Sequence, residues 1–263
     1  MVNWRYFIPF AYFISSRLKT PDRILSWIII YPVSLLLAYV TFAHQVSAEA
    51  LLTMLAGMAA IYTVYELGYL ANDSFTVKSE VEPTLRLTAQ QQVWIEAHWN
   101  LILTSRLSLT LVIIACLLPS QPDGLVVFCC SILLVAITFY FYNRTRGAIS
   151  IPLHFILVVC RFSGPCMLVM PEIGFLAFTI VAFPLINLME RAAEPRYKLT
   201  WAQQLIFSNQ GSGRWLYYLI MSLVWAGLTL GLEMELETVS LLVFLFLYRL
   251  ISPLIVKHVF SNA

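Results

Sequence analysis

The sequence predicts an all-α membrane protein, a bundle of about eight transmembrane helices with an interfacial N-terminal segment, in one domain over residues 1–263. The first observation is the composition, since 60% of the residues are hydrophobic and only 11% are charged. A soluble domain carries roughly 25% charged residues, and a mean hydropathy of +0.81 excludes this chain from that class. The other two observations are long unbroken apolar runs and a regular alternation in the charge of the loops between them.

The apolar runs have the length of membrane-spanning helices. Such a helix needs about 20 mostly apolar residues. The runs are continuous rather than alternating between apolar and polar residues, which argues against membrane strands. They cover residues 24–43, 51–71, 100–118, 125–142, 149–170, 173–189, 215–232 and 239–256.

Residues 1–23 precede the first span and carry aromatic side chains flanked by arginine. This composition suits a helix that lies in the membrane interface over residues 3–18, with its aromatic side toward lipid. Pro9 argues against a single straight helix there. No small-residue cleavage site follows an apolar core, so we do not expect a cleaved signal peptide.

The connections between the spans differ in charge from one side of the membrane to the other. Residues 47–49, 119–124, 171–172 and 233–237 contain no Lys or Arg. Cationic residues stay on the cytoplasmic side during insertion. We therefore expect a multi-pass protein of a bacterial inner membrane with both termini cytoplasmic. The cationic side then holds Arg5, Arg17, Lys19, Arg23, Lys78, Arg86, Arg144, Arg146, Arg191, Arg196, Lys198, Arg214 and Lys257.

The first long cytoplasmic loop, residues 73–99, is entered through an acidic stripe. Glu66, Asp73 and Glu80 are seven residues apart, so they lie over one another on a helix. Carboxylates at the mouth of a bundle can hold Mg²⁺, whose other positions are filled by phosphate oxygens and water. The alternative is an ordinary solvated helix end, in which acids and lysines mingle.

The second long loop, residues 190–214, repeats this pattern. Asn187, Glu190 and Glu194 share one helix face. Cationic side chains follow closely, namely Arg191, Arg196, Lys198 and Arg214. Two acidic clusters beside cations indicate one site for Mg²⁺ and a diphosphate, with arginines on phosphate oxygens. The segment 142–146 emerges on the same side, either as a third contributor or as a positive-inside anchor.

These segments resemble motifs of the UbiA superfamily of membrane prenyltransferases. That family carries N-D-x-x-D-x-x-x-D after its second helix, a second acidic motif after the sixth and a Tyr-Lys/Arg segment after the fourth. Asn72-Asp73 matches the start of the first motif and Glu80 stands at its last Asp, whereas Thr76 replaces the middle Asp. The branch that it resembles most is that of the decaprenyl-phosphate phosphoribosyltransferases, through Pro83-Thr84-Leu85-Arg86 and Glu190-Arg191-Ala192-Ala193-Glu194. The resemblance covers the helix order and three loops, although family members usually have nine spans.

The resemblance implies a Mg²⁺-dependent transferase that moves a phosphoribosyl group from phosphoribosyl diphosphate to a polyprenyl phosphate, for cell-envelope polysaccharide synthesis. One alternative is transfer of a prenyl group from a prenyl diphosphate to an aromatic acceptor, and another is a non-catalytic UbiA-like membrane subunit. The resemblance implies catalytic roles for Asp73, Glu80, Glu190 and Glu194, and metal binding by Asp73, Glu80 and Glu194. The implied substrate-binding residues are Asn72, Lys78, Arg86, Tyr142, Arg144, Arg146, Asn187, Arg191, Arg196 and Lys198. Expected partners are the lipid substrate, the phosphorylated sugar donor and membrane lipid, without nucleic acid and with a homo-oligomer left open.

Charged residues also occur at membrane depth, namely Glu66, Arg106, Arg161 and Arg249. Such groups usually face the bundle interior or each other, because an unpaired charge in lipid is expensive. One option is a Glu66–Arg161 pair. Arg106 and Arg249 could instead extend to the cytoplasmic interface.

Overall fold

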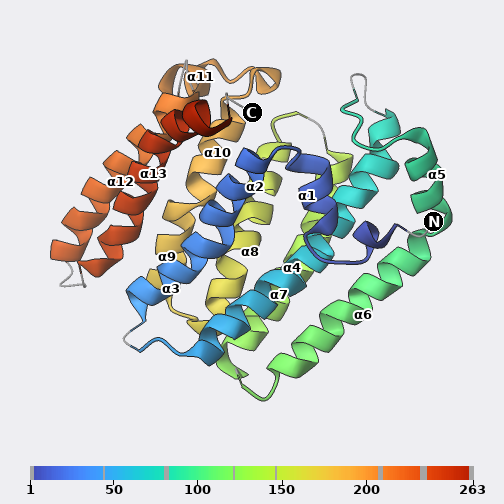
Figure 1. Ribbon diagram of the computed structural model, residues 1–263, viewed down its shortest axis with the longest axis horizontal. Coiled ribbons are helices and arrows are strands. Elements are labelled where there is room, and N and C mark those ends of the chain that lie inside the picture. Colours follow the sequence, from blue (N-terminus) through green and yellow to red (C-terminus); the bar gives the residue numbers. More distant parts are fainter. Residues whose placement is uncertain are drawn as a thin grey trace.

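The computed structural model describes residues 3–43, 45–79, 83–120, 122–145, 147–206, 210–231 and 236–260. All regular structure in these ranges is helical, as the sequence predicts (Figure 1). The elements, in chain order, are η1 (Trp4–Tyr6), α1 (Ala11–Arg17), α2 (Pro21–Ile28), η2 (Ile29–Val33), α3 (Ser34–Phe42), α4 (Ala48–Ser74), η3 (Thr76–Ser79), α5 (Ala89–Ala97), α6 (Trp99–Leu117), α7 (Pro122–Arg144), α8 (Ser150–Val169), α9 (Ile173–Ala182), α10 (Pro184–Ala192), η4 (Pro195–Tyr197), α11 (Thr200–Ile206), α12 (Gln210–Gly231) and α13 (Glu237–Phe260).

Six segments within the described ranges are long and apolar enough to cross a membrane. They overlap the first six predicted spans, which confirms an all-helical protein with several membrane-spanning helices. α12 and α13 occupy the seventh and eighth predicted positions, and the count of eight stays a prediction. The six segments are Pro21–Phe42, Ala48–Ser74, Trp99–Leu117, Gly124–Arg144, Ser150–Val169 and Ile173–Ala192.

Two of these spans are interrupted at proline. Pro32 lies in η2, a π-helical turn that joins α2 to α3. Pro184 starts α10 directly after α9 ends, because a proline has no N–H to continue the helical ladder. Tyr217 and Tyr218 of α12 donate their hydroxyl hydrogens to the carbonyl oxygens of Val181 and Ala182 beside this break. Backbone carbonyls at membrane depth need such partners, so the break in one span fixes the position of another helix.

α4 is the central helix and packs against α6, α7 and α8. Figure 1 shows α12 and α13 side by side at one edge of the bundle, with α6 at the opposite edge. Small residues permit close approach where α7 meets α8. A Cβ at Gly124 would overlap the carbonyl oxygen of Leu168, so the two backbones touch there.

The N-terminal segment differs from the interfacial helix that the sequence predicts. It is divided into η1 and α1, and Phe10 between them has a φ of 68°. Tyr6, Tyr12 and Phe13 are buried by the protein itself rather than left for lipid. This segment enters the bundle because buried polar groups of α4 and α6 bind its backbone.

The buried ion pair that holds this segment is not the expected one. Arg106 Nη1 lies 2.8 Å from Glu66 Oε2, and both side chains are fully buried. A Glu66–Arg161 pair is therefore wrong, and Arg106 does not extend to the interface. Arg106 Nε also donates to the carbonyl oxygen of Tyr6 at 2.7 Å, and Phe13 N donates to Glu66 Oε1 at 2.6 Å.

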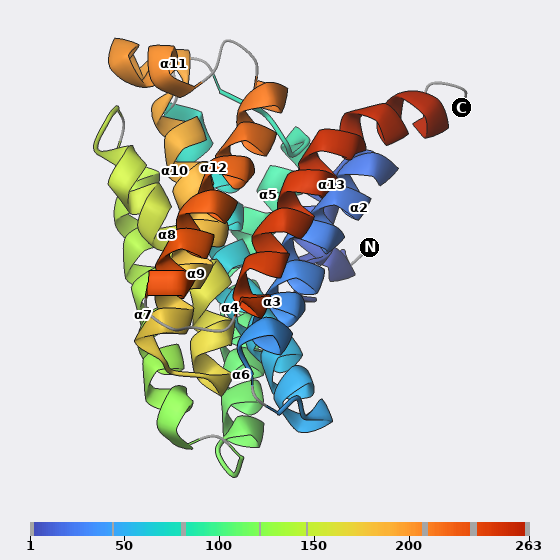
Figure 2. The same cartoon turned by 90° about the vertical axis from the view of Figure 1, so that its left-hand side faces the viewer.

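The predicted cytoplasmic segments gather at one end of the bundle. In both views α11 and the end of α13 lie toward one end, and the end of α6 lies at the other (Figures 1 and 2). This grouping is what the loop charges predict. Which end faces the cytoplasm stays a prediction.

Candidate functional site

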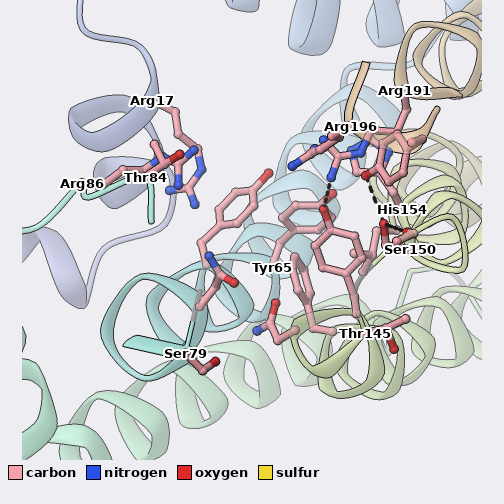
Figure 3. A pocket seen from close by; sticks show the side chains of 18 residues that line it. Arg17, Tyr65, Ser79, Thr84, Arg86, Thr145, Ser150, His154, Arg191 and Arg196 are labelled. Carbon is pink, nitrogen blue, oxygen red and sulfur yellow. Dashed lines mark hydrogen bonds between the residues drawn. The ribbon is translucent and has the colours of Figure 1, made fainter. Parts of the chain in front are cut away.

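A pocket of about 510 Å³ opens among the helix ends that carry the three predicted motif segments. We call it the arginine pocket, because Arg17, Arg86, Arg191 and Arg196 line it. Figure 3 shows Arg17 and Arg86 on one side and Arg191 and Arg196 on the other. Its lining residues are Arg17, Tyr65, Tyr69, Asn72, Ser79, Thr84, Arg86, Phe139, Tyr142, Asn143, Thr145, Gly147, Ser150, His154, Leu157, Arg191, Arg196 and Tyr197.

The first arginine cluster is built around Asp73 at the end of α4. Arg17 Nη2 lies 3.0 Å from Asp73 Oδ2, and Arg86 Nη1 lies 3.3 Å from Asp73 Oδ1. Tyr12 donates its hydroxyl hydrogen to Asp73 Oδ2 at 2.6 Å. The Asp73 side chain is fully buried, so the alternative of a solvated helix end is wrong for this residue.

Tyr12 also belongs to this cluster. It lies in α1, which precedes the membrane-spanning segments. Burial, and next the negative charge of Asp73, raise the pKa of the Tyr12 phenol well above its ordinary value. The phenol therefore stays protonated and donates to the carboxylate. Asp73 is thus bound by two neutral donors, Tyr12 and Asn72, and by two cations, which fix its orientation.

The second cluster is built around Glu194, which follows α10. Arg191 Nη1 lies 2.9 Å from Glu194 Oε1, and Arg196 Nη2 lies 2.6 Å from Glu194 Oε2. Arg191 Nη2 also donates to the Tyr142 hydroxyl oxygen at 2.5 Å, which joins the end of α7 to this side of the pocket. The Arg196 side chain is 56% exposed, whereas that of Arg191 is 17% exposed.

Each cluster has two arginines and one carboxylate, so each carries a net charge of +1 (2 − 1). The clusters face one another across the pocket (Figure 3). An arginine guanidinium has five N–H donors, and the carboxylate contacts use only some of them. All four arginines line the cavity, so it has guanidinium donors and an excess of positive charge, which is the chemistry that binds phosphate or diphosphate.

Aromatic side chains form the wall between the clusters. Tyr65, Tyr69 and Asn72 lie on one face of α4, four and three residues apart, and all line the pocket. The Arg17 guanidinium carbon lies 3.6 Å from the centre of the Tyr69 ring, within the range of a cation–π contact. The spacing 65, 69, 72 was a signal in the sequence for these tyrosines. The acidic residues Glu66 and Asp73 lie on a neighbouring face of the same helix.

His154 and Arg17 are further lining residues that motif analysis missed. The Nδ1 atom of His154 is buried and has no hydrogen-bond partner among the described residues. Neither residue stands in a motif. In the sequence Arg17 is one of several cations near the first span, and the folded N-terminal segment brings it to the pocket.

Five of the predicted substrate-binding residues line the pocket, namely Asn72, Arg86, Tyr142, Arg191 and Arg196. Four others that the structure describes do not, namely Lys78, Arg144, Lys198 and Asn187. Lys78 pairs with Glu96 at 2.5 Å, Arg144 stacks on Tyr140 with its guanidinium carbon 3.7 Å from the ring centre, and Lys198 is exposed. Asn187 and Glu190 line a different cavity, where Glu190 pairs with Arg214. Glu80 and Arg146 lie outside the described residues.

Two of the three predicted magnesium ligands, Asp73 and Glu194, are paired with arginines, and the third, Glu80, lies outside the described residues. Both oxygens of Asp73 are engaged by arginines, and so are both oxygens of Glu194. Among the described residues, no three His, Cys, Asp or Glu side chains gather closely enough to hold a metal ion. The carboxylates orient arginines in this conformation, and the Mg²⁺ requirement stays a prediction.

Comparison with known proteins leaves the site to be interpreted from its own residues. No family model, curated protein or solved structure matches this chain. The resemblance to the UbiA superfamily rests on the helix order and the three motif segments. The activity that it implies is therefore a proposal.

Proposed function

We propose that the chain is a membrane transferase of the UbiA type that moves a phosphoribosyl group from phosphoribosyl diphosphate to a polyprenyl phosphate. The observation that carries this proposal is the pair of arginine clusters that face one another across the arginine pocket. They offer positive charge from two sides to a donor that bears a diphosphate and a separate phosphate. A donor with both groups can engage both clusters at once.

The proposed reaction develops negative charge on the leaving diphosphate. The bond between the sugar carbon and the diphosphate oxygen breaks, and the bonding electrons leave with the diphosphate. Arginine N–H groups already in place stabilise this growing negative charge without reorganising during the reaction. An oxygen of the lipid phosphate then bonds to the electron-poor sugar carbon, and a fully ionised phosphate has no proton to release.

The location of the pocket suits such a reaction. We propose that all eight predicted helices span the inner membrane and that both termini are cytoplasmic. The arginine pocket then faces the compartment in which a soluble sugar phosphate is found. The lipid acceptor reaches the same end of the bundle from the membrane.

The test is an assay with purified full-length protein, labelled phosphoribosyl diphosphate and a polyprenyl phosphate, followed by detection of labelled lipid. Arg191→Ala should raise the KM for the donor roughly ten- to a hundredfold, because a charge-assisted contact contributes about 1.5–3 kcal/mol. Arg144→Ala is the matched control, since Arg144 stacks on Tyr140 outside the pocket. A chelator added to the same assay tests the predicted Mg²⁺ requirement, and we expect turnover to stop.

Two results would contradict the proposal. Transfer of a prenyl group to an aromatic ring, without use of phosphoribosyl diphosphate, would favour the prenyltransferase alternative. Absence of turnover with any donor would favour the non-catalytic alternative. One observation supports that second alternative. Both carboxylate oxygens of Asp73 are already bound, by Tyr12, Arg17 and Arg86.

A further inference from the structure

His154 lines the arginine pocket, and neither the motif segments nor the proposed reaction gives it a role. It lies in the second turn of α8, close to the start of that helix. Its Nδ1 atom is buried and has no hydrogen-bond partner within the part of the chain that the structure describes. A buried polar atom costs free energy until a partner completes it. In the wall of a pocket, such an atom points to a ligand.

The ring of His154 packs against aromatic and apolar side chains. Its centre lies 6.1 Å from that of the Tyr142 ring, with 44° between the two planes. Leu157, one turn further along α8, is buried and lines the same pocket. These neighbours hold the imidazole in place, and neither of them bonds to Nδ1.

The hydroxyl groups next to His154 already use their hydrogens within the protein. Ser150 lies one turn before His154 and donates its hydroxyl hydrogen to the carbonyl oxygen of Gly147 at 2.8 Å. The Ser150 oxygen also lies 3.0 Å from the Tyr197 hydroxyl oxygen. Because a serine hydroxyl has one hydrogen, Tyr197 is the donor in this second bond. Neither hydroxyl has a hydrogen left for Nδ1.

Arg191 has an unfilled position on the same side of the pocket (Figure 3). Its Nη1 donates to Glu194 and its Nη2 to the Tyr142 hydroxyl oxygen. Its Nε, in contrast, is buried without a partner among the described residues. Tyr142 contacts both Arg191 and His154, so the two unfilled nitrogens flank one tyrosine. One ligand can therefore complete both.

The chemistry of the two nitrogens indicates what this ligand carries. The Nε of Arg191 can only donate, and a phosphate oxygen suits it. Nδ1 of a neutral histidine donates in one tautomer and accepts in the other. An ionised phosphate has no hydrogen, so it completes only the donating tautomer, whereas a hydroxyl completes either. A phosphate with a hydroxyl beside it is what a phosphorylated sugar offers, and a prenyl diphosphate has no hydroxyl.

We propose that His154 binds a sugar hydroxyl through Nδ1 and thereby selects a phosphorylated sugar over phosphate compounds without hydroxyls. A site built to bond a substrate hydroxyl disfavours an analogue that lacks it, because the polar group of the site is then left unpaired. The identity of this sugar as the phosphoribosyl donor rests on the proposed function. The hydroxyl contact itself stands on the geometry of the pocket.

The test compares two ligands that differ in hydroxyl groups alone. Ribose 5-phosphate and tetrahydrofurfuryl phosphate share the five-membered ring and the phosphate, and the second compound has no hydroxyl. Isothermal titration calorimetry with the purified full-length protein in neutral detergent measures both affinities. We expect ribose 5-phosphate to bind roughly three- to tenfold more tightly, which is the contribution of one neutral hydrogen bond.

Two variants of His154 assign this preference to Nδ1. Leucine and asparagine have nearly the same shape, and only asparagine has polar atoms on Cγ, where Nδ1 is attached in histidine. His154→Leu should bind both compounds equally, and His154→Asn should keep most of the preference for ribose 5-phosphate. Unchanged binding of tetrahydrofurfuryl phosphate shows that His154→Leu is folded.

Three results would overturn the proposal. One is equal binding of the two compounds by the wild type, and another is a preference that survives in His154→Leu. The third is an equal weakening of both compounds in the two variants, which would assign His154 to the phosphate or to packing.

The same measurements separate this proposal from the proposed function. The expected preference without any phosphoribosyl transfer in the labelled-donor assay would reject the function and keep the sugar contact. Transfer by a wild type that binds the two compounds equally would keep the function and reject the contact.

Discussion

The first prediction concerns the contribution of the buried Glu66–Arg106 pair to the free energy of unfolding. Both side chains are fully buried, with Arg106 Nη1 2.8 Å from Glu66 Oε2. Arg106 also donates to the carbonyl oxygens of Tyr6 and Ile8, at 2.7 and 3.2 Å. The pair therefore fastens the N-terminal segment to α4 and α6. We expect Glu66→Gln to weaken the fold and to release this segment.

The expected loss of unfolding free energy follows from the group that Glu66→Gln removes. Glutamine keeps an oxygen for the N–H of Phe13 and removes only the charge, which leaves the Arg106 guanidinium buried without a counter-ion. Breaking a buried pair by removing one partner costs about 3–5 kcal/mol. Glu96→Gln is the matched control, because its partner Lys78 is 54% exposed. That exposed pair contributes about 0–1 kcal/mol.

Two measurements check this prediction. Equilibrium unfolding in mixed micelles gives the free energy of unfolding, and the two variants should differ by at least about 2 kcal/mol. Tryptic cleavage after Arg17 reports release of the N-terminal segment and should be faster in Glu66→Gln than in Glu96→Gln. Replacing both partners, as Glu66→Gln with Arg106→Gln, should recover part of the loss, because no unpaired charge is left. Equal unfolding free energies for Glu66→Gln and Glu96→Gln, with equal cleavage rates, would refute the reasoning.

Three further predictions concern topology, packing and the first arginine cluster. A cysteine at Ser120 should react with an impermeant thiol reagent added outside cells and one at Ser79 should not; the opposite result would reverse the orientation. Gly124→Ala should lower the free energy of unfolding by about 1–3 kcal/mol, because the added methyl overlaps a backbone oxygen of α8. Gly174→Ala, whose Cβ would meet nothing within 4 Å, should lower it by no more than about 0.5 kcal/mol, and equal losses would reject the packing argument. Asp73→Asn should cost about 3–5 kcal/mol in the same unfolding assay, because it leaves two arginines without their buried counter-ion; a loss below about 1 kcal/mol would show that this carboxylate does not hold them.

The helices could be predicted because their signal is carried by each segment alone. An apolar run of about 20 residues is a membrane helix in almost any context. The gathering of the three motif segments could also be expected from loop charge, since all three lie on the cationic side. Asn72, Tyr142 and Arg191 line one pocket, as that argument anticipates.

The partners of individual charges could not be predicted in the same way. Helical periodicity shows that Glu66 and Asp73 share a face, but not which neighbour that face meets. α4 packs against both α6 and α8, and Arg106 and Arg161 lie one on each. The N-terminal segment determines which partners these residues have. It binds Glu66 through the N–H of Phe13 and Asp73 through the hydroxyl of Tyr12. The neighbouring face of α4, with Tyr65 and Tyr69, then lines the pocket.

Thr76 stands where the UbiA motif that this segment resembles carries its middle Asp. Thr76 donates its hydroxyl hydrogen to Asn72 Oδ1 at 2.9 Å, and Asn72 Nδ2 lies 3.2 Å from Asp73 Oδ1. The hydroxyl thus sets the orientation of the Asn72 amide, so that its N–H group points to Asp73. An ionised aspartate at position 76 has no hydrogen to donate, and it would place a second negative charge beside an Asp73 that is already bound by two arginines. The threonine therefore adds no negative charge beside Arg17 and Arg86, which line the pocket, and this is the residue type that the proposed phosphate site would favour.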